Sequence, residues 1–424
     1  MNHRPSPPPP PERNPPPPDR NRPLPLGAPP ARPTATGQVN ALGARWGREL
    51  DHAANQAWTA LGVWPLLAML AAGAAGPART ELEQALGVPA NQAPAQAREL
   101  LELIRRVPGC AAALGVWTAA DAGVEPAWAA LLGPSAHREL TGDRDKDRAA
   151  LDGWAREQTE GLLPGLPLDL DQDTQLVLAS ALLVRTRWPV PFRPGFAEVA
   201  AGPWAGRPVD GLEHSGPELF RRISVARGAA GPVTEVRITG GGGIDVHLVL
   251  GEPAATPGAV VAAGFDLVAG ALPRIPLTDL PDGTPAPGLR LAPRTDGRQQ
   301  DLGTLRTVAF TVRALHDLCE RAELFGLTAA GAEDEGWFPG ISRRMPLYVA
   351  EARQSTLAAF SAAGFEAGAV TALRARLGAG VPPHRERPRA ATASFDRPFA
   401  FLAVHRPTGL VLMAGWVAEP GTAS

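Results

Sequence analysis

Cysteine is scarce in this chain of 424 residues: only Cys110 and Cys319 are present, far apart in the sequence. Two cysteines cannot build the disulfide framework of a small secreted domain. No CxxC pair occurs, which argues against a zinc site based on cysteine. We expect two buried thiols.

Long apolar runs are missing as well. No stretch of about 18 apolar residues occurs, so the sequence predicts no membrane-spanning helix. The N-terminus has no apolar segment before a cleavage site and does not look like a signal peptide. These absences together predict a cytoplasmic protein. The net charge of −2 provides no overall field that would steer the chain toward nucleic acid or a membrane.

The motifs of common enzyme classes are also absent. The sequence has no HExxH, GxSxG or GxxxxGK[ST] pattern, and Gly240–Gly243 is not followed by Lys-Ser/Thr or by a predicted helix. His316 and Cys319 stand at a helical spacing that would allow a metal pair, but the apolar neighbours Leu315 and Leu318 favour an ordinary helix face. We therefore expect a protein that is not an enzyme and needs no cofactor or metal.

Proline dominates the beginning of the chain, with runs at Pro7–Pro11 and Pro15–Pro18. Proline fixes φ and removes a hydrogen-bond donor, so this backbone can neither pair nor pack regularly. We expect residues 1–37 to form a disordered tail and residues 38–420 to form one domain. The tail contains PxxP spacings, which can be recognition motifs, but an inert spacer is the favoured interpretation.

The remaining sequence predicts both helices and strands. Apolar periodicity with Pro before and Gly after predicts helices that include 66–73, 80–86, 95–106 and 151–159. The apolar run 174–184 is typical of a strand buried on both faces. Segments 233–238 and 244–250, and then 399–404 and 409–417, alternate as two β-hairpins. The sequence predicts an α+β fold with a helix-rich N-terminal half.

Four segments carry motifs of a known family, in the same order. They are residues 68–87, the strand 176–192 ending in Arg187-Trp188-Pro189-Val190-Pro191-Phe192, residues 346–364, and the C-terminal stretch 395–415 with its Pro-Phe, Thr-Gly turn and two apolar strands. Together they resemble the serpin family over about Asn40 to Pro420. We interpret the chain as a divergent serpin of bacterial type.

The resemblance implies the serpin fold, with large central mixed and antiparallel sheets and an exposed reactive loop at about residues 364–394. It also implies an inhibitor of serine-type, or cysteine-type, endopeptidases that acts as a suicide substrate. In this mechanism the cut loop inserts as a strand into the central sheet and releases stored strain. The implied partner is a trypsin-like or subtilisin-like protease, and the protein is expected to be a monomer.

The resemblance assigns a hinge at the start of the loop. Its residues are Gly364, Phe365, Glu366, Ala367, Gly368, Ala369, Val370 and Thr371. Two features depart from the family: Ala362-Ala363 replaces an acidic pair, and Phe365 stands where inhibitory members have a small Ser or Thr. Overpacking costs about 1–3 kcal/mol. Phe365 is thus an obstacle to insertion, and slow insertion would let the protease complete hydrolysis and leave. Inhibition is still the favoured expectation, with a non-inhibitory substrate protein as the alternative.

The bait itself is expected farther along the loop. Insertion carries the protease across the molecule at ~3.3 Å per residue, so the scissile bond should lie roughly 14 residues beyond Gly364. The candidate region is Arg374, Arg376, Leu377 and Gly378, because trypsin-like enzymes cut after arginine. The basic cluster Arg385–Arg389 lies too far along and is equally well read as a solvated loop.

The resemblance also implies a polar cluster that controls opening of the sheet. Gln354 stands at the usual histidine and Ser180 at the usual asparagine, while Thr59 and Gly62 occupy serine positions. Trp188 matches a tryptophan at the end of the sheet where insertion begins, and it is also an ordinary large core residue.

Two other functions remain open. A non-inhibitory binding or substrate protein on the serpin scaffold is the main alternative. A polyanion-binding role for the basic loop is weaker, and it predicts affinity that falls steeply with salt.

Overall fold

The computed structural model describes residues 35–132, 136–158, 160–161, 165, 170, 174–196, 198–199, 202–333, 335–366 and 387–421. The first helix begins at Thr36, two residues before the predicted domain boundary. The helices are α1 (Thr36–Glu49), α2 (Ala60–Gly73), α3 (Gly76–Leu86), α4 (Ala93–Arg106), α5 (Pro126–Leu132), α6 (Arg144–Gln158), α7 (Pro217–Phe220), α8 (Pro257–Ala269) and α9 (Ala322–Phe325). In the part that the structure describes, no helix is long and apolar enough to cross a membrane.

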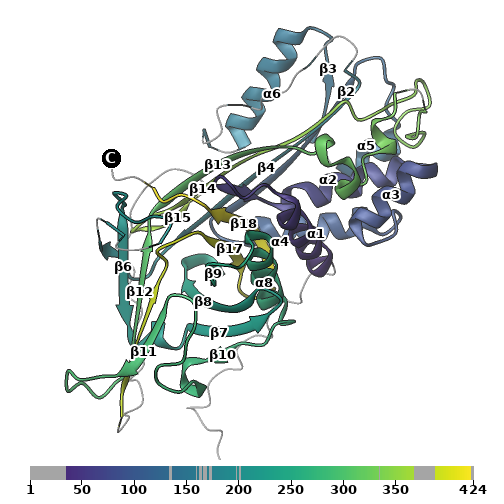
Figure 1. Ribbon diagram of the computed structural model, residues 1–424. Helices are drawn as coiled ribbons and strands as arrows, with labels where there is room; N and C mark the ends of the chain where they lie inside the picture. Colours follow the sequence, from purple (N-terminus) through teal and green to yellow (C-terminus); the bar gives the residue numbers. More distant parts are fainter. Residues whose placement is uncertain are drawn as a thin grey trace, which may run out of the picture. The chain divides into compact units, whose positions relative to one another are not determined.

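The strands form three sheets (Figure 1). The six-stranded sheet has the order β13 (Phe310–Asp317), β14 (Glu351–Phe360), β15 (Gly364–Glu366), β4 (Leu176–Arg187), β2 (Cys110–Ala119), β3 (His137–Leu140). The seven-stranded sheet has the order β1 (Gln56–Trp58), β18 (Leu410–Val417), β17 (Phe399–His405), β9 (Ile244–Gly251), β8 (Gly231–Thr239), β7 (Ile223–Gly228), β10 (Ile275–Pro276). The five-stranded sheet has the order β11 (Leu289–Pro293), β16 (Arg389–Ser394), β12 (Leu302–Val308), β6 (Gly211–Gly216), β5 (Arg193–Pro194). The α+β prediction is confirmed.

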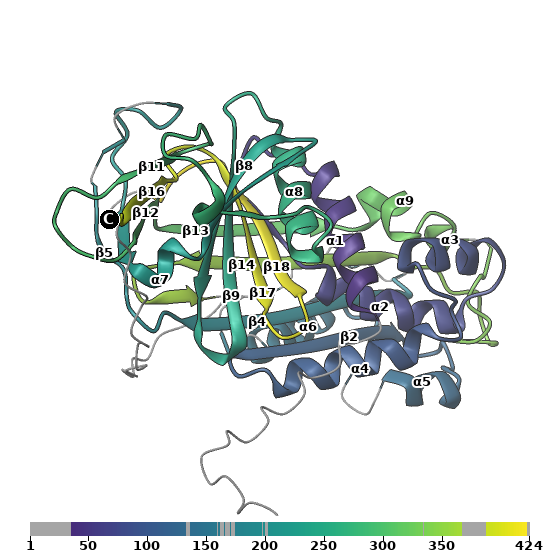
Figure 2. The same cartoon turned by 90° about the horizontal axis from the view of Figure 1, so that it is seen from below.

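The apolar run of β4 is explained by helices on both faces of the six-stranded sheet. Val177 and Ala179 pack with Trp154 of α6 on one face, whereas Leu176 and Leu178 belong to the main core on the other. Figures 1 and 2 show α6 on one side of this sheet and α2 and α4 on the other. Alternate residues of a strand point to opposite faces, so a strand covered on both sides has to be apolar throughout.

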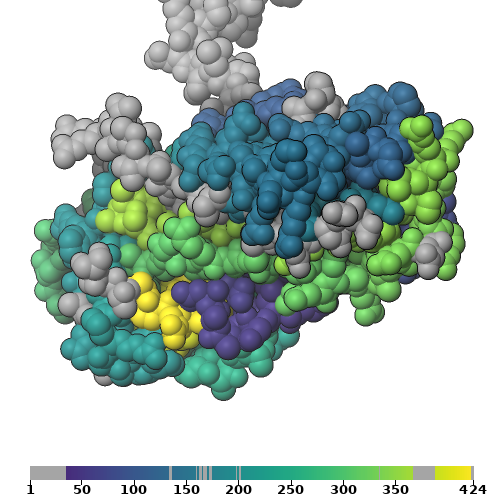
Figure 3. All heavy atoms as spheres, turned by 90° about the horizontal axis from the view of Figure 1, so that it is seen from above, coloured from purple at the N-terminus to yellow at the C-terminus, as the bar shows by residue number. Residues whose placement is uncertain are grey.

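Helix α1, at the start of the domain, is hydrogen-bonded to the turn and strand near its C-terminal end. Asn40 of α1 donates from Nδ2 to the carbonyl of Gly409 (2.8 Å) and accepts from the amide of Val411 (2.9 Å). Gly409 has φ of +70°, a value that the predicted Thr-Gly turn between β17 and β18 requires. Figure 3 accordingly shows N-terminal residues (purple) beside C-terminal residues (yellow).

A buried ionic cluster stabilises the seven-stranded sheet. The Glu235 carboxylate is fully buried and accepts hydrogen bonds from Ser224 Oγ (3.0 Å), His247 Nδ1 (2.8 Å), and Arg274 Nε (2.5 Å) and Nη2 (2.8 Å). Burial alone would raise the pKa of Glu235, but the hydrogen bonds from His247 and Arg274 outweigh it and lower that pKa. The cluster ties the segment after α8 to strands β7, β8 and β9.

We expect Glu235→Gln to lower the free energy of unfolding by about 3–5 kcal/mol, because Arg274 is left without its counter-charge. Glu213→Gln is the matched control, since Glu213 and its partner Arg306 (3.0 Å) are both exposed. That change should cost less than about 1 kcal/mol. Denaturant unfolding of both variants measures the difference, and equal effects would contradict a stabilising role for the cluster.

Candidate functional site

Three residues of the predicted loop already lie in the central sheet. Strand β15 is antiparallel to both of its neighbours, with Gly364, Phe365 and Glu366 opposite Arg187, Thr186 and Arg185 of β4. On the other side, Phe365 and Glu366 pair with Phe360 and Ala359 of β14. Farther along, β14 and β4 pair directly in parallel over Glu351–Gln354 and Val177–Ser180. The sheet is therefore forked, and β15 occupies the fork (Figure 1).

Gly364 is required by a close approach of two backbones. A Cβ atom at this position would lie 2.4 Å from the carbonyl oxygen of Thr186, which is far inside van der Waals contact. A side chain here would therefore push β15 away from β4.

Phe365 is accommodated, contrary to the expectation of an obstacle. Its side chain is 0% exposed, and its ring centroid lies 5.9 Å from that of Phe401. Phe310 joins the same group of rings, 5.0 Å from Phe401 and 5.3 Å from Phe360. The aromatic residues between the two large sheets thus provide the space that the sequence alone did not reveal. The structure thus already accommodates the Phe365 side chain, for which an overpacking cost was expected.

Trp188 holds the turn that leads into β15. Its Nε1 donates to the carbonyl of Ser361 (3.0 Å), and its backbone amide donates to that of Ala363 (3.1 Å). The amide of Phe192 donates to the carbonyl of Ala362 (2.9 Å). The Trp188 ring lies 5.2 Å from that of Phe360. Trp188 therefore contacts the entrance of the fork as well as its core.

The polar residues at the closed end of the fork lie together. Gln354 and Ser180 are paired across β14 and β4, and both are buried. Gln354 accepts from the amide of Thr59 at Oε1 (2.9 Å) and donates from Nε2 to the carbonyl of Thr59 (2.9 Å). A Cβ atom on Gly62 would lie 2.9 Å from Ser180 Oγ and 3.1 Å from Gln354 Nε2. We call Gln354, Ser180, Thr59 and Gly62 the polar cluster.

The sequence did not point to a second set of contacts beside this cluster. His316 Nε2 lies 2.7 Å from the carbonyl oxygen of Ala57, and Thr356 Oγ1 donates to the same oxygen (2.7 Å). His316 is in strand β13 and pairs with Gln354, so the predicted helix over His316 and Cys319 is wrong. Val312 and His316 of this strand are buried, whereas the residues on either side of them alternate to the exposed face, and the strand pairs with β14 along its length. Among the described residues, no group of three or more His, Cys, Asp or Glu side chains could hold a metal.

Acidification is expected to destabilise the protein between about pH 6.5 and 5.5. Burial is the main cause that lowers the pKa of His52, His137, His214, His316 and His405. The unfolded chain, in which the pKa of histidine is about 6.5, therefore takes up protons before the folded state does. The neutral, buried histidines therefore contribute to the free energy of unfolding above about pH 6.5. This contribution is lost as the pH falls toward the histidine pKa values of the folded state. Melting temperatures at pH 7.5 and 5.5 test this, and a higher value at pH 5.5 would contradict it.

Much of the predicted loop lies outside the described residues. This holds for Ala367, Gly368, Ala369, Val370 and Thr371 of the hinge and for the bait candidates Arg374, Arg376, Leu377 and Gly378. The loop was expected to extend to residue 394, but Arg389–Ser394 form strand β16. Arg389 is not a solvated residue either, because its side chain is only 14% exposed and donates to the carbonyls of Leu280 (2.7 Å) and Leu277 (2.8 Å).

The two cysteines are free, and both are partly buried where two buried thiols are expected from the sequence. Burial raises the pKa of Cys110 to about 12 and is the main cause that raises that of Cys319 to about 11. Thiols with such pKa values are poor nucleophiles at neutral pH.

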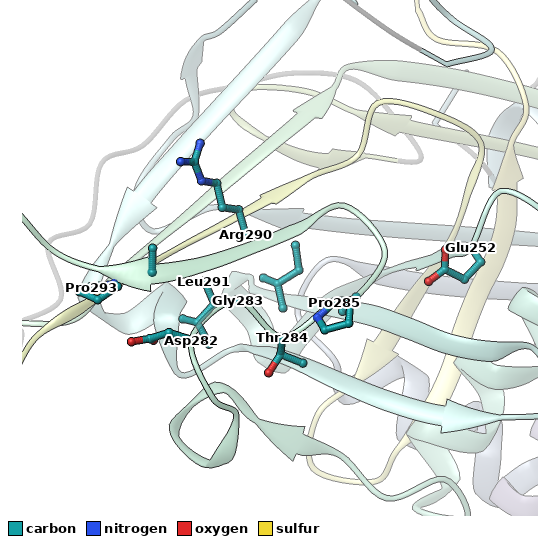
Figure 4. A pocket seen from close by; sticks show the side chains of 11 residues that line it. Glu252, Asp282, Gly283, Thr284, Pro285, Arg290, Leu291 and Pro293 are labelled. Atoms are coloured by element: carbon teal, nitrogen blue, oxygen red, sulfur yellow. The ribbon is translucent and has the colours of Figure 1, made fainter.

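A groove of about 710 Å³ runs beside β11 (Figure 4). It is lined by residues 282–286 and 289–293 and by Glu252. The amide of Gly283 donates to the carbonyl of Leu291 (2.9 Å), and that of Leu289 donates to Ala286 (3.1 Å), so the outer edge of β11 is largely capped. The described lining has no histidine, cysteine or serine and offers no ordinary nucleophile–base pair.

Comparison with known families matches residues 38–199 and 310–420 to Serpin (serine protease inhibitor). A protein named putative serpin-Z6C from Oryza sativa subsp. japonica is 26% identical over 92% of this chain and 98% of its own length. Plasminogen activator inhibitor 1 of Sus scrofa is 26% identical over 66% of this chain and 63% of its own length. These relatives come from a plant and a mammal and give no support to a bacterial-type assignment.

The fold has close structural neighbours. The crystal structure of native protease nexin-1 with heparin superposes with a TM-score of 0.67 at 18% identity, covering 91% of this chain and 98% of that one. At this identity the likeness establishes the fold alone. The geometry of the fork and of the polar cluster therefore has to be interpreted from this chain's own residues.

Proposed function

Because the chain belongs to the serpin family, we propose that it inhibits a serine-type or cysteine-type endopeptidase as a suicide substrate. Family membership and the names of its relatives support protease inhibition as a role. The proposal adds the mechanism, which is insertion of the cut loop between β14 and β4. We also propose that the protein is a monomer, catalyses no reaction of its own and needs no cofactor.

The observation that carries the proposal is the forked sheet, with β15 already between β14 and β4. Each further inserted residue would step one position back along both neighbours. Glu366 is opposite Arg185 and Ala359, so Thr371 would come opposite Ser180 on one side and Gln354 on the other. Both registers thus bring the same loop residue to the polar cluster. Opening the pairing of Gln354 with Ser180 would then be the step that admits the rest of the loop.

In this proposal Gly364–Thr371 is the hinge, and Arg374, Arg376, Leu377 and Gly378 contain the scissile bond. The polar cluster and Trp188 control entry into the sheet. Incubation with a trypsin-like and a subtilisin-like protease, followed by a denaturing gel, tests the proposal. A covalent adduct that survives SDS supports it, whereas complete cleavage without an adduct would refute inhibition.

Arg376→Ala is expected to reduce attack by the trypsin-like enzyme by about tenfold or more, because the preferred arginine is lost. The stability should change by less than about 0.5 kcal/mol, because a bait residue has to be accessible to the protease and surface substitutions usually cost no more than this. Arg374→Ala is the matched control and should have the smaller effect on cleavage. Mass spectrometry of the cut chain identifies the bond, and an unchanged cleavage site and rate in Arg376→Ala would exclude this bait.

A specific observation keeps the non-inhibitory alternative open. Phe365 packs firmly in the fork before any cleavage, at 0% exposure. A hinge that rests this stably inside the sheet could serve as a fixed element of a binding or substrate protein. That function predicts clean cleavage and no adduct in the same gel.

A further inference from the structure

Three basic side chains lie in a row across the seven-stranded sheet. Arg237 of β8 is paired with His247 of β9. The amide of Arg237 also donates to the carbonyl of Arg222 (3.0 Å), the residue just before β7, so these two arginines are directly opposite each other. Residues that are directly opposite in adjacent strands point to the same face of a sheet, and the three side chains therefore share one face. We call Arg222 and Arg237 the arginine pair.

Helix α8 covers only one end of this row. The row continues from His247 to Leu402 of β17. A Cβ atom on Gly264 of α8 would lie 2.7 Å from Leu402 Cδ1, so the helix rests on that end. The arginine pair is at the other end, where both residues are half-buried. The helix therefore borders the arginine pair without covering it.

Two carboxylates on the same face already have arginine partners of their own. Glu235 accepts two hydrogen bonds from Arg274, as described above. Asp245 of β9 accepts two from Arg406, one from Nε (2.9 Å) and one from Nη2 (2.6 Å). These pairs balance each other in charge. The positive charge that they leave uncompensated on this face is that of the arginine pair.

The arginine pair has no acceptor among the residues that the structure describes. Neither guanidinium forms a hydrogen bond or an ion pair there, and Arg237 Nε is buried without a partner. Thr239 Oγ1, two residues farther along β8 and on the same face, is also buried without a partner. Burial is the main cause that lowers the pKa of Arg237; Glu235 opposes this change, and the charges of Arg274 and Arg222 add to it. The environment of Arg237 thus lacks a counter-charge.

We propose that the arginine pair binds an oxyanion, namely a phosphate or sulfate group, on the face of the sheet that carries α8. Two like charges directly opposite each other destabilise a sheet, and a buried donor without an acceptor adds to the cost. An oxyanion between the two guanidinium groups supplies the acceptors and cancels the repulsion. The planar guanidinium suits this role, because it can form two parallel hydrogen bonds to such oxygens.

The group can belong to a free ion or to a small phosphomonoester, since the two share the same oxygens. The site uses no residue of the fork or of the polar cluster. It is therefore independent of the proposed function, and the experiment below does not depend on protease inhibition.

Titration calorimetry of the full chain tests the site with three probes: inorganic phosphate, sulfate and glycerol 3-phosphate, each in a chloride buffer of equal ionic strength. Arg222→Gln and Arg237→Gln should each weaken binding by about tenfold or more, as for the loss of a charge-assisted hydrogen bond. Arg227→Gln is the matched control, because Arg227 is an exposed arginine of the same strand, and it should leave binding unchanged. Arg237→Lys keeps the charge but not the planar fork and should have an intermediate effect.

Thermal melts give a second measurement. At a phosphate concentration ten times the Kd, the melting temperature of the wild type should rise by about 2 °C relative to the chloride buffer. The rise should persist in Arg227→Gln and be absent in Arg222→Gln and Arg237→Gln. The melts in chloride also show whether each variant is folded, and Arg237→Lys keeps the test valid if a Gln variant is not.

The three probes also distinguish the sources of the group. Tighter binding of glycerol 3-phosphate than of inorganic phosphate supports a phosphomonoester as the ligand, and the reverse order supports the free ion. Failure of all three probes to bind, or equal binding by the wild type and both Gln variants, would overturn the proposal. A sulfated oligosaccharide that binds through the arginine pair when the small probes do not would overturn it as well, in favour of an extended polyanion.

Discussion

Cutting the bait loop is expected to raise the melting temperature of this protein by roughly 5–20 °C. The cut chain can continue the strand begun by Gly364–Glu366 and bond to β14 and β4 along both edges. Each added hydrogen bond contributes about 0.5–1.5 kcal/mol. At an unfolding entropy of about 2.1 cal/mol/K per residue, about 1 kcal/mol shifts the melting temperature of a domain of roughly 380 residues by ~1 °C. Ten or so new bonds therefore give an effect of this order.

The measurement is a thermal melt of the chain before and after limited cleavage in the loop. A chain lacking residues 1–34 and left uncut is the control, because it shows whether loss of the tail alone changes stability. An unchanged or lower melting temperature of the loop-cut chain would remove the main physical support for insertion.

The parts of the fold that the sequence predicts well depend on local patterns. These parts include the apolar run of β4, the alternating strands of the hairpin β8–β9, and the Thr-Gly turn before β18. Each is predicted from residues that are adjacent in the sequence. The four predicted helices are found, with ends that differ by several residues: the helix predicted from Ala95 begins at Ala93. These elements follow from alternation and from turn residues, which are properties of neighbouring positions.

The parts that the sequence does not reveal depend on distant partners. Phe365 looks like an obstacle until Phe401, which lies in another sheet, is placed beside it in the space that it fills. Arg389 looks like one more solvated arginine until the carbonyls of Leu277 and Leu280 are placed around it. A cavity or a binding pocket for a side chain is a tertiary property, so spacing along the chain carries no signal for it.

The polar cluster is an intermediate case. Gln354, Ser180, Thr59 and Gly62 were implied by resemblance, and the structure places them in contact. From the sequence, His316 is expected on an ordinary helix face, because its spacing from Cys319 fits a helical turn. The pairing of β13 with β14 decides otherwise, since a long edge strand beside an existing sheet gains hydrogen bonds along its whole length.

The resting position of Phe365 also changes what its replacement should do. If Phe365 were an obstacle, Phe365→Thr would speed insertion and increase the covalent complex. Because the ring is already buried beside Phe401, we expect the opposite. Loss of the aromatic side chain should cost about 3–5 kcal/mol, as for other buried Phe residues cut back to a small side chain. The hinge is then released from the fork, and insertion has to start from outside the sheet.

Phe365→Thr should therefore lower the melting temperature of the uncut chain by roughly 4–6 °C. It should also shift the products with a protease from SDS-stable complex toward cleaved chain. Phe365→Met, which keeps an apolar side chain of similar volume, should cost less than about 1.5 kcal/mol and preserve the product ratio. Val190→Ala removes an exposed side chain at the same end of the sheet and should change neither quantity measurably. If Phe365→Thr instead leaves stability intact and increases the complex, Phe365 restrains insertion, and the anchoring role of its ring is wrong.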